Sequence, residues 1–366
     1  MANQNSMNPI DVSRLGQINA TSDGTFAQDN AMFLKVFSGE VLQVFEEANV
    51  MMPLHTVRTI ASGKTAQFPV MGTASAKYHT PGESILGSGL DSSGSDGVLD
   101  EAKYLSKIKH AERTISIDGT LLSSAFIADI DEAKNHYDVR SAYTTQIGRE
   151  LAYHSDRALI RTVIAGARAT TDRFGVASGT STQFLGAQID TTQTGTGDTD
   201  QVYDAGDLVE GIAQAAQKMD EKNVPSEGRY CLLTPALYYT LVKSGNDAIN
   251  TDFGGMGSIA TGEVAQVAGI RIMKSNHIPN SNEAGTLFDD AAIANNPFGG
   301  TAGYSANFSN TAGIIFQTEG VGTVKLLDLA LESEYQLDRL GTLMVAKYAM
   351  GHGVLREECC YELITQ

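Results

Sequence analysis

The chain has 366 residues, and its 26 Lys and Arg against 43 Asp and Glu give a formal net charge of −17. A hydrophobic share of 42% excludes a chain that is disordered as a whole. The acidic balance excludes nucleic-acid binding by counter-charge over the whole surface, and three Cys residues exclude a disulfide framework.

No segment has the form of a targeting or membrane sequence. The N-terminal residues MANQNSMNPIDVSRLG lack the basic start and apolar run of a signal peptide. Nowhere do 18 apolar residues run together, as a membrane-spanning helix requires. Together with the low Cys content, this indicates a protein made in a reducing cytosol.

The first third of the chain predicts an arm followed by a long hairpin. Residues 1–30 are polar, as in an extended arm. Residues 54–72 and 103–119 are typical of two long strands, with a tight turn at Ser62–Gly63 inside the first. The Gly- and Ser-rich residues 73–102 form the tip. Because a two-stranded ribbon of this length is unstable alone in water, it requires a partner surface.

Helices are predicted where apolar residues recur at a spacing of three or four. These segments are residues 31–50, 135–166 and 204–222, and a short helix that Pro235 opens. The second is the longest, and Asn135 with Asp138 resembles a capping box at its start.

The remainder of the chain predicts strands and loops. Residues 229–234 read as a buried strand, and residues 262–279 as helix, turn and strand. Residues 168–203 and 280–312 are rich in Gly, Thr and Asn and predict long loops. Residues 313–364 alternate between apolar and polar side chains, which favours several long strands.

The search for catalytic and ligand-binding motifs finds no convincing candidate. Arg58 to Thr65 ends like a phosphate-binding loop but lacks its first Gly and does not open a helix. Residues 255–260 mimic a dinucleotide fingerprint without the preceding strand. Asp129 and Asp131 begin like a calcium loop, but Lys134 stands where Gly is needed.

The seven His residues make no metal-binding spacing. His352 lies between Gly351 and Gly353, where a turn that needs glycine geometry is a better interpretation than a catalytic base. We therefore expect no catalytic residue, no metal and no cofactor, and a protein that is not an enzyme.

Positive charge lies along the second strand of the predicted hairpin. Lys103, Lys107, Lys109 and Arg113 share one face of an extended strand because their spacing is even, and His110 adjoins them. One interpretation is a solvated edge that Lys protects from aggregation. The other is electrostatic docking onto an acidic neighbour, and residues 186–253 hold 11 acidic against 4 basic side chains.

Several stretches resemble the major capsid protein of T-seven-like short-tailed phages. They are FLKVFSGEVL (33–42), HTVRTIASGKTAQFPVMG (55–72), YHTPGES (78–84), IKHAERTISIDG (108–119), DIDEAKNHYDVRSAYTTQIGREL (129–151), VGTVKLLDLALE (321–332) and AKYAMGHGVLRE (346–357). They cover roughly a third of the chain, in order. The match between the motifs and the phage family is specific, and it suggests a podophage, with a cyanophage as one possible source.

The resemblance implies the Hong Kong 97-type capsid fold, of class α+β, with an N-terminal arm, an extended β-hairpin loop, a peripheral domain with a long spine helix, and an axial domain. The implied divisions are an arm and short helix at 1–52, the extended loop at 53–119, the peripheral domain at 120–200 and 319–366 with the spine helix at 135–166, and the axial domain at 201–318.

The resemblance further implies a structural subunit that assembles as hexamers and pentamers into an icosahedral shell around double-stranded DNA, with T=7 geometry and procapsid maturation expected. The implied partners are copies of itself, a scaffolding protein, the portal and tail proteins at one vertex, and DNA held without sequence specificity, with no membrane. The implied location is the virion capsid, assembled in the host cytoplasm.

Candidate inter-subunit contacts are charged residues in the matching stretches and on the positive strand: Arg58, Lys64, Glu83, Lys103, Lys107, Lys109, Arg113, Asp138 and Arg140. The covalent Lys–Asn crosslink of the fold's namesake is not implied for Lys64. Two alternatives stay open: a cellular, encapsulin-like compartment shell, and a hydrolase that uses the lobe at 201–318.

Overall fold

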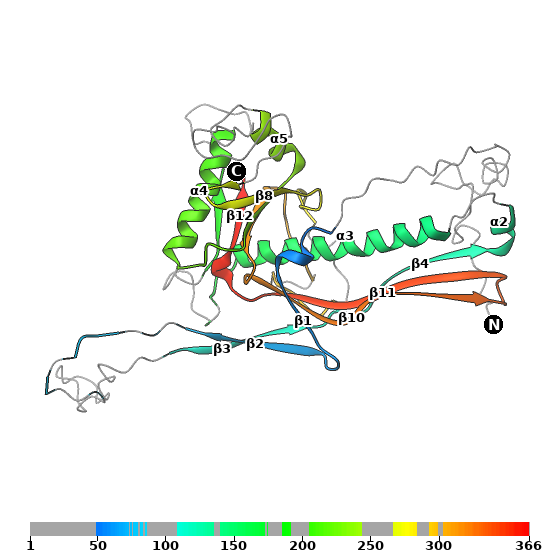
Figure 1. Ribbon diagram of the computed structural model, residues 1–366, viewed down its shortest axis with the longest axis horizontal. Coiled ribbons are helices and arrows are strands. Elements are labelled where there is room, and N and C mark those ends of the chain that lie inside the picture. Colours follow the sequence, from blue (N-terminus) through cyan, green and yellow to red (C-terminus); the bar gives the residue numbers. More distant parts are fainter. Residues whose placement is uncertain are drawn as a thin grey trace.

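The computed structural model has an elongated body, from which a long hairpin projects at one end (Figure 1). The structure describes residues 49–72, 74, 76–79, 81, 82, 85, 108–134, 140–172, 174, 185–191, 205–243, 266–283, 293–298 and 303–365. The predicted arm, most of the helix at 31–50 and most of the hairpin tip therefore lie outside the described residues.

A four-stranded sheet forms the long part of the body. Its order is β1-β10-β11-β4, with β1 parallel to β10 and the other pairs antiparallel. The strands are β1 (Thr56–Thr59), β10 (Val321–Gln336), β11 (Gly341–Val354) and β4 (Leu121–Ala128). The long strands confirm the alternation predicted for residues 313–364, whereas β1 belongs to this sheet and not to the hairpin. The turn at Gly63, whose φ is 114°, separates the two.

The long helix α3 (Arg140–Ala167) runs along this sheet and into the second lobe (Figure 1). Ile147 and Leu151 pack on the sheet near its N-terminal end, against Met344 and Tyr348 of β11. Further along, side chains on all sides of the helix are buried, from Ala158 to Ala167. The helix therefore joins the cores of the two sheets.

The start of the predicted helix differs from the structure. Residues 129–134 form a separate short helix α2 (Asp129–Lys134), which contains the acidic pair Asp129 and Asp131. Residues 135–139 lie outside the described residues, and so does the predicted cap of Asn135 with Asp138.

A six-stranded sheet of order β5-β12-β9-β6-β8-β7 forms the second lobe. Its strands are β5 (Ala187–Asp190), β12 (Cys360–Ile364), β9 (Thr311–Gln317), β6 (Arg229–Leu233), β8 (Ile270–Lys274) and β7 (Gln266–Val267). The helices α4 (Ala205–Glu221) and α5 (Pro235–Lys243) pack on one face, and α3 on the other. Every residue of β9 is buried between these layers.

Three predictions for this lobe need correction. Residues 187–190 form β5 inside a predicted loop, because β12 offers them a parallel partner 174 residues away. Gln266–Val267 is a strand and not helix: Ala268 and Gly269 both have positive φ, as a two-residue hairpin turn requires. The predicted boundaries at 200 and 318 place β5 and β12 outside the lobe, whereas strand pairing puts both inside its sheet.

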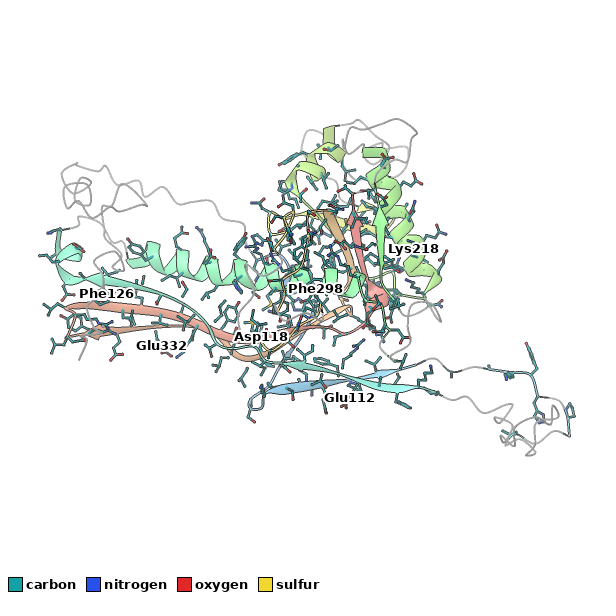
Figure 2. The ribbon with its side chains drawn as sticks, turned by 180° about the vertical axis from the view of Figure 1, so that it is seen from behind. Glu112, Asp118, Phe126, Lys218, Phe298 and Glu332 are labelled. Atoms are coloured by element: carbon teal, nitrogen blue, oxygen red, sulfur yellow. The ribbon has the colours of Figure 1, made fainter. Side chains whose placement is uncertain are left out.

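The projecting hairpin consists of β2 (Thr65–Met71) and β3 (His110–Ser116), paired in antiparallel register from Thr65↔Ser116 to Met71↔His110. Figure 2 shows Glu112 on this hairpin, Phe126 and Glu332 on the far arm of the long sheet, and Asp118 between them. The hairpin packs on the body through Ala66 and Ile115, which share an apolar cluster with Val324 and Leu355, and Phe68 of β2 packs against this cluster.

Candidate assembly site at the base of the hairpin

The hairpin rests on a surface made of glycine backbone. Gly322 of β10 pairs with Gly353 of β11, and Gly351 lies two residues along. A Cβ on Gly351 would overlap the carbonyl oxygen of Ser116, and one on Gly353 would lie 2.8 Å from a side-chain carbon of Ile115. The end of β3 thus lies directly on the backbone of β11, which only residues without a side chain permit.

This arrangement corrects the predicted turn at Gly351-His352-Gly353. The segment is extended and lies inside β11. Its glycines serve backbone geometry, as the sequence predicts, but through close approach of a second strand and not through a turn.

Polar groups hold the strand in place on the glycines. Asn295 donates from Nδ2 to the carbonyl of Ser116 and accepts at Oδ1 from its N–H. Asp118 accepts the N–H groups of Ala294 and Asn295 at 2.8 and 3.0 Å, and the hydroxyl of Tyr304 at 2.7 Å. Burial raises the pKa of the Asp118 carboxyl, while these donors lower it. The loop at 293–298 is therefore fastened to the chain that leaves the hairpin.

A chain of hydrogen bonds beneath the glycines joins Met51, His55, Thr323 and His352. His55 Nδ1 is 2.8 Å from the Met51 carbonyl, His55 Nε2 is 2.6 Å from Thr323 Oγ1, and that oxygen is 2.9 Å from His352 Nδ1. In a neutral His55 ring the proton lies on Nδ1, because the Met51 carbonyl only accepts, and Thr323 then donates to Nε2. Thr323 in turn accepts from His352 Nδ1–H.

The pKa values of these rings agree with that arrangement. Burial lowers the pKa of His55, and burial together with the neighbouring His55 lowers the pKa of His352 to about 3. His352 is therefore a structural group whose Nδ1 is engaged with Thr323, and not the flexible catalytic base that was the alternative.

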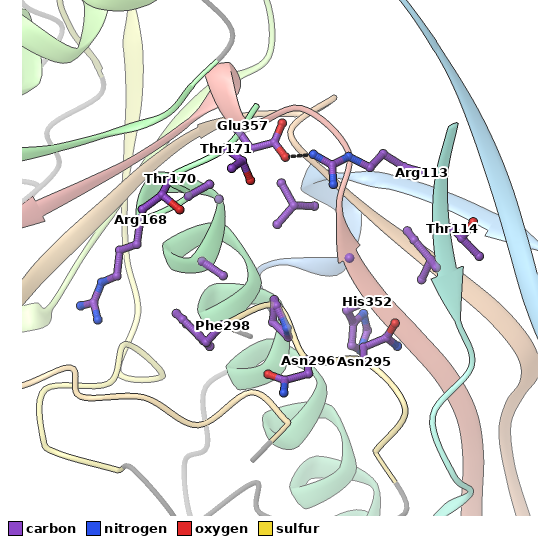
Figure 3. A pocket seen from close by; sticks show the side chains of 17 residues that line it. Arg113, Thr114, Arg168, Thr170, Thr171, Asn295, Asn296, Phe298, His352 and Glu357 are labelled. Carbon is purple, nitrogen blue, oxygen red and sulfur yellow. Dashed lines mark hydrogen bonds and ion pairs between the residues drawn. The ribbon is translucent and has the colours of Figure 1, made fainter. Parts of the chain in front are cut away.

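One ion pair joins the outer part of the hairpin to the body. Arg113 of β3 contacts Glu357 through Nη2 and Oε1, and Glu357 lies in the 3-10 helix η4 (Glu357–Cys359). Beside the pair lies a cavity of about 590 Å³ between β3, the end of α3, β11 and the loop at 293–298. Figure 3 shows Arg113 and Glu357 at one side of this cavity and Asn295 and His352 at another.

The predicted contact residues differ in their surroundings. Arg58, Lys64 and Lys109 are exposed, and Arg58 donates to the Gln67 carbonyl of β2 at 2.9 Å and lies over the Phe68 ring. Arg113 shares a face with Lys109 but is engaged by Glu357 of its own chain. The others are Glu83, Lys103, Lys107 and Asp138, which lie outside the described residues, and Arg140, which begins α3.

A second exposed feature lies at the opposite end of the long sheet. The turn after β10 carries Leu337 and Leu340, which are 77% and 62% exposed. Ile130 of α2 and Tyr335 are also exposed. They lie near the turn, because Leu340 accepts the Asp129 N–H and Tyr335 donates to the Asp129 carboxylate. Sequence reasoning missed this apolar end of the sheet, although the two Leu in QLDRLG carried a signal.

Comparisons with known proteins agree on one family. A family model described as Gp10A-like major capsid protein matches residues 67–364. The chain is similar to the major capsid protein of Escherichia phage T7, at 35% identity over 90% of both chains. It is also similar to that of Enterobacteria phage T3, at 34% identity over 95% of this chain and 96% of the other.

A solved structure confirms the likeness at the level of the fold. The capsid structure of the cyanophage P-SCSP1u covers 99% of both chains with a TM-score of 0.73 and 38% sequence identity. The α+β fold of phage capsid proteins expected from the sequence is therefore confirmed.

Proposed function

Because the chain belongs to the family of Gp10A-like major capsid proteins, we propose that it builds the wall of a phage head as hexamers and pentamers that close into an icosahedral shell around double-stranded DNA. Its role is structural: the subunit forms a capsid shell from copies of itself. Ring composition, the T=7 geometry and maturation from a procapsid are parts of the proposal.

The observation that carries the proposal is the β2–β3 hairpin, which the subunit leaves largely unsupported. Its apolar contact with the body is made by Ala66, Phe68 and Ile115, and Met71 further along the hairpin is 60% exposed. A two-stranded ribbon is at best marginally stable alone in water. A neighbouring copy supplies the missing surface in a shell.

The apolar end of the long sheet supports the same proposal. Ile130, Tyr335, Leu337 and Leu340 together form an exposed apolar patch, which is typical of a protein–protein contact. The hairpin and this patch lie at opposite ends of the molecule (Figure 1). Each subunit can thereby contact more than one neighbour, and many weak contacts stabilise a closed shell through multivalency.

We assign the parts of the capsid fold as follows. The hairpin is the extended loop, the four-stranded sheet with α3 as spine helix is the peripheral domain, and the six-stranded sheet with α4 and α5 is the axial domain. Most of the expected arm and short helix at 1–52 lies outside the described residues. Relative to the boundaries expected from the sequence, β1 moves to the peripheral domain, and β5 and β12 move to the axial domain.

The proposed partners beyond further copies are a scaffolding protein during assembly, the portal and tail proteins at one vertex, and DNA on the inner face without sequence-specific contacts. A net charge of −17 per subunit supports a wall that does not grip DNA. No helix among the described residues is long and apolar enough to span a membrane.

A cellular compartment shell and a hydrolase are not favoured, because the matching family and relatives are phage capsid proteins.

Electron microscopy of the expressed chain tests the proposal, with and without its co-expressed scaffolding protein. Closed shells or tubes of regular subunits are the expected result. A folded monomer that forms no higher assembly under either condition would contradict it.

A further inference from the structure

The hairpin is held to the body by few contacts beyond its base. On the β2 side, Arg58 donates to the Gln67 carbonyl, and this contact is exposed. On the β3 side, the only ion pair between hairpin and body among the described residues joins Arg113 to Glu357. The angle of the hairpin therefore depends on the glycine surface and on these two side-chain links.

The Arg113–Glu357 pair is incomplete. Arg113 uses Nη2 and Glu357 uses Oε1, while Arg113 Nε and Glu357 Oε2 are buried and have no hydrogen-bond partner among the described residues. A bidentate pair would have satisfied both atoms. Burial of a charge is costly when its hydrogen bonds are incomplete, so the neutral form of Glu357 is favoured at this position more than it is in water.

The surroundings leave room for the hairpin to move. The cavity of about 590 Å³ is lined on one side by Arg113, Thr114 and Ile115 of β3, and on the other by residues of the body, including Glu357 (Figure 3). Of the described residues of β3, Ile115 is the one that belongs to the apolar cluster shared with the body. The hairpin can turn about Ser116, which stays held by Asn295.

We propose that the Arg113–Glu357 ion pair is a proton-released latch that sets the angle of the β2–β3 hairpin relative to the body. Ionised Glu357 holds Arg113 and keeps the hairpin in the position that the structure has. Protonated Glu357 frees it to turn about Ser116. The consequence for shell geometry rests on the proposed function, whereas the motion itself belongs to the single subunit.

The charges around Glu357 agree with release in mild acid. Burial raises the pKa of Glu357, Arg113 lowers it, and the neighbouring Glu358 raises it. Arg168 and His352 line the same cavity, but Arg168 is engaged by Glu362 and burial keeps His352 neutral. Because the pKa of Glu357 is raised, the folded subunit binds a proton at Glu357 more tightly than the unfolded chain does. Protonation of Glu357 as pH falls therefore opens the latch without lowering the stability of the fold.

Distances between two spin labels on the full-length, unassembled subunit test the latch. The labels are placed at Met71→Cys on the hairpin and Glu227→Cys on the body, both exposed, whereas the three native Cys are buried. Between pH 7.5 and pH 5, we expect the population at the original distance to fall by more than half. The variant Glu357→Gln is expected to have the acid distribution already at pH 7.5 and to lose the pH response.

The matched control is Glu319→Gln, which removes a carboxylate from the Glu319–Arg356 pair inside the body and is expected to behave like the parent. If Glu357→Gln does not fold, Arg113→Gln serves instead, because the Arg113 side chain is one-third exposed. The proposal is overturned if Glu357→Gln has the distance distribution of the parent at pH 7.5, or if its distance distribution still changes with pH. Electron microscopy separately measures whether the same variants form shells. If a variant fails to assemble while its label distances show the expected pH response, the result bears only on the proposed function.

Discussion

Ser116 lies so close to Gly351 that a single methyl group on Gly351 would overlap the Ser116 carbonyl oxygen. Asn295 fixes Ser116 through two hydrogen bonds, so the strand cannot easily move away. The junction of hairpin and body is therefore a contact between backbones, and its glycines cannot be exchanged without strain.

The first prediction follows from this contact. Gly351→Ala is expected to lower the free energy of unfolding by about 3 kcal/mol, because it forces an extra methyl group into a packed site. Urea unfolding measures the change. Gly148→Ala is the matched control: no atom outside the helix backbone lies within 4 Å of its added Cβ, and replacing Gly inside a helix should stabilise by about 1 kcal/mol. An unchanged stability of Gly351→Ala would contradict the glycine surface.

The second prediction compares a buried with an exposed carboxylate. Glu362 is fully buried and accepts hydrogen bonds from Arg168, Gln188 and Thr311, which tie the residue after α3, β5 and β9 to β12. Glu362→Ala removes a fully buried carboxylate that pairs with the half-buried Arg168 and should cost about 3 kcal/mol of unfolding free energy.

In contrast, Glu332 pairs with Lys347 at 2.9 Å on the exposed part of the long sheet. Glu332→Ala should cost less than about 1 kcal/mol, since exposed ion pairs contribute little. Both values come from the same urea experiment. Equal costs at the two positions would refute the distinction.

The third prediction concerns pH. Burial, with nearby charge, lowers the pKa of His154 to about 4 and that of His352 to about 3, whereas an unfolded His titrates near pH 6.5. The unfolded chain therefore binds more protons below pH 6.5, and stability falls as pH falls from there towards the folded pKa values. Each ring contributes a slope of about 1.4 kcal/mol per pH unit.

Unfolding free energies measured between pH 4.5 and pH 6 give this slope. His352→Asn is expected to reduce the slope by about 1.4 kcal/mol per pH unit, because Asn can still donate to Thr323 but does not titrate. A slope that stays the same in the variant would show that His352 is not the titrating group.

The fourth prediction concerns the apolar end of the long sheet. Leu337 is 77% exposed, so Leu337→Asp should leave the melting temperature unchanged while it strongly reduces the yield of shells. Analytical ultracentrifugation and electron microscopy measure assembly. Leu337→Met keeps the apolar surface and is expected to assemble normally, and normal assembly of the Asp variant would exclude this patch as a contact.

The sequence by itself determined the elements whose pattern is local and long. Apolar spacing predicted α4 and most of α3, alternation predicted the strands from β9 to β12, and the motifs such as AKYAMGHG identified the family. These features are encoded within a few turns or strand repeats, so they are visible without knowledge of what lies beside them.

Only the tertiary structure decided which partners meet. The short strands β1 and β5 are defined by β10 and β12, far along the chain. Arg113 and Glu357 are 244 residues apart, and nothing near Arg113 in the sequence indicates that its charge is used inside the subunit. The same holds for Gly351, whose need for a bare backbone arises from Ser116 lying against it. A contact between distant segments leaves no periodic pattern in either one, and this is why the junction of hairpin and body emerged only from the fold.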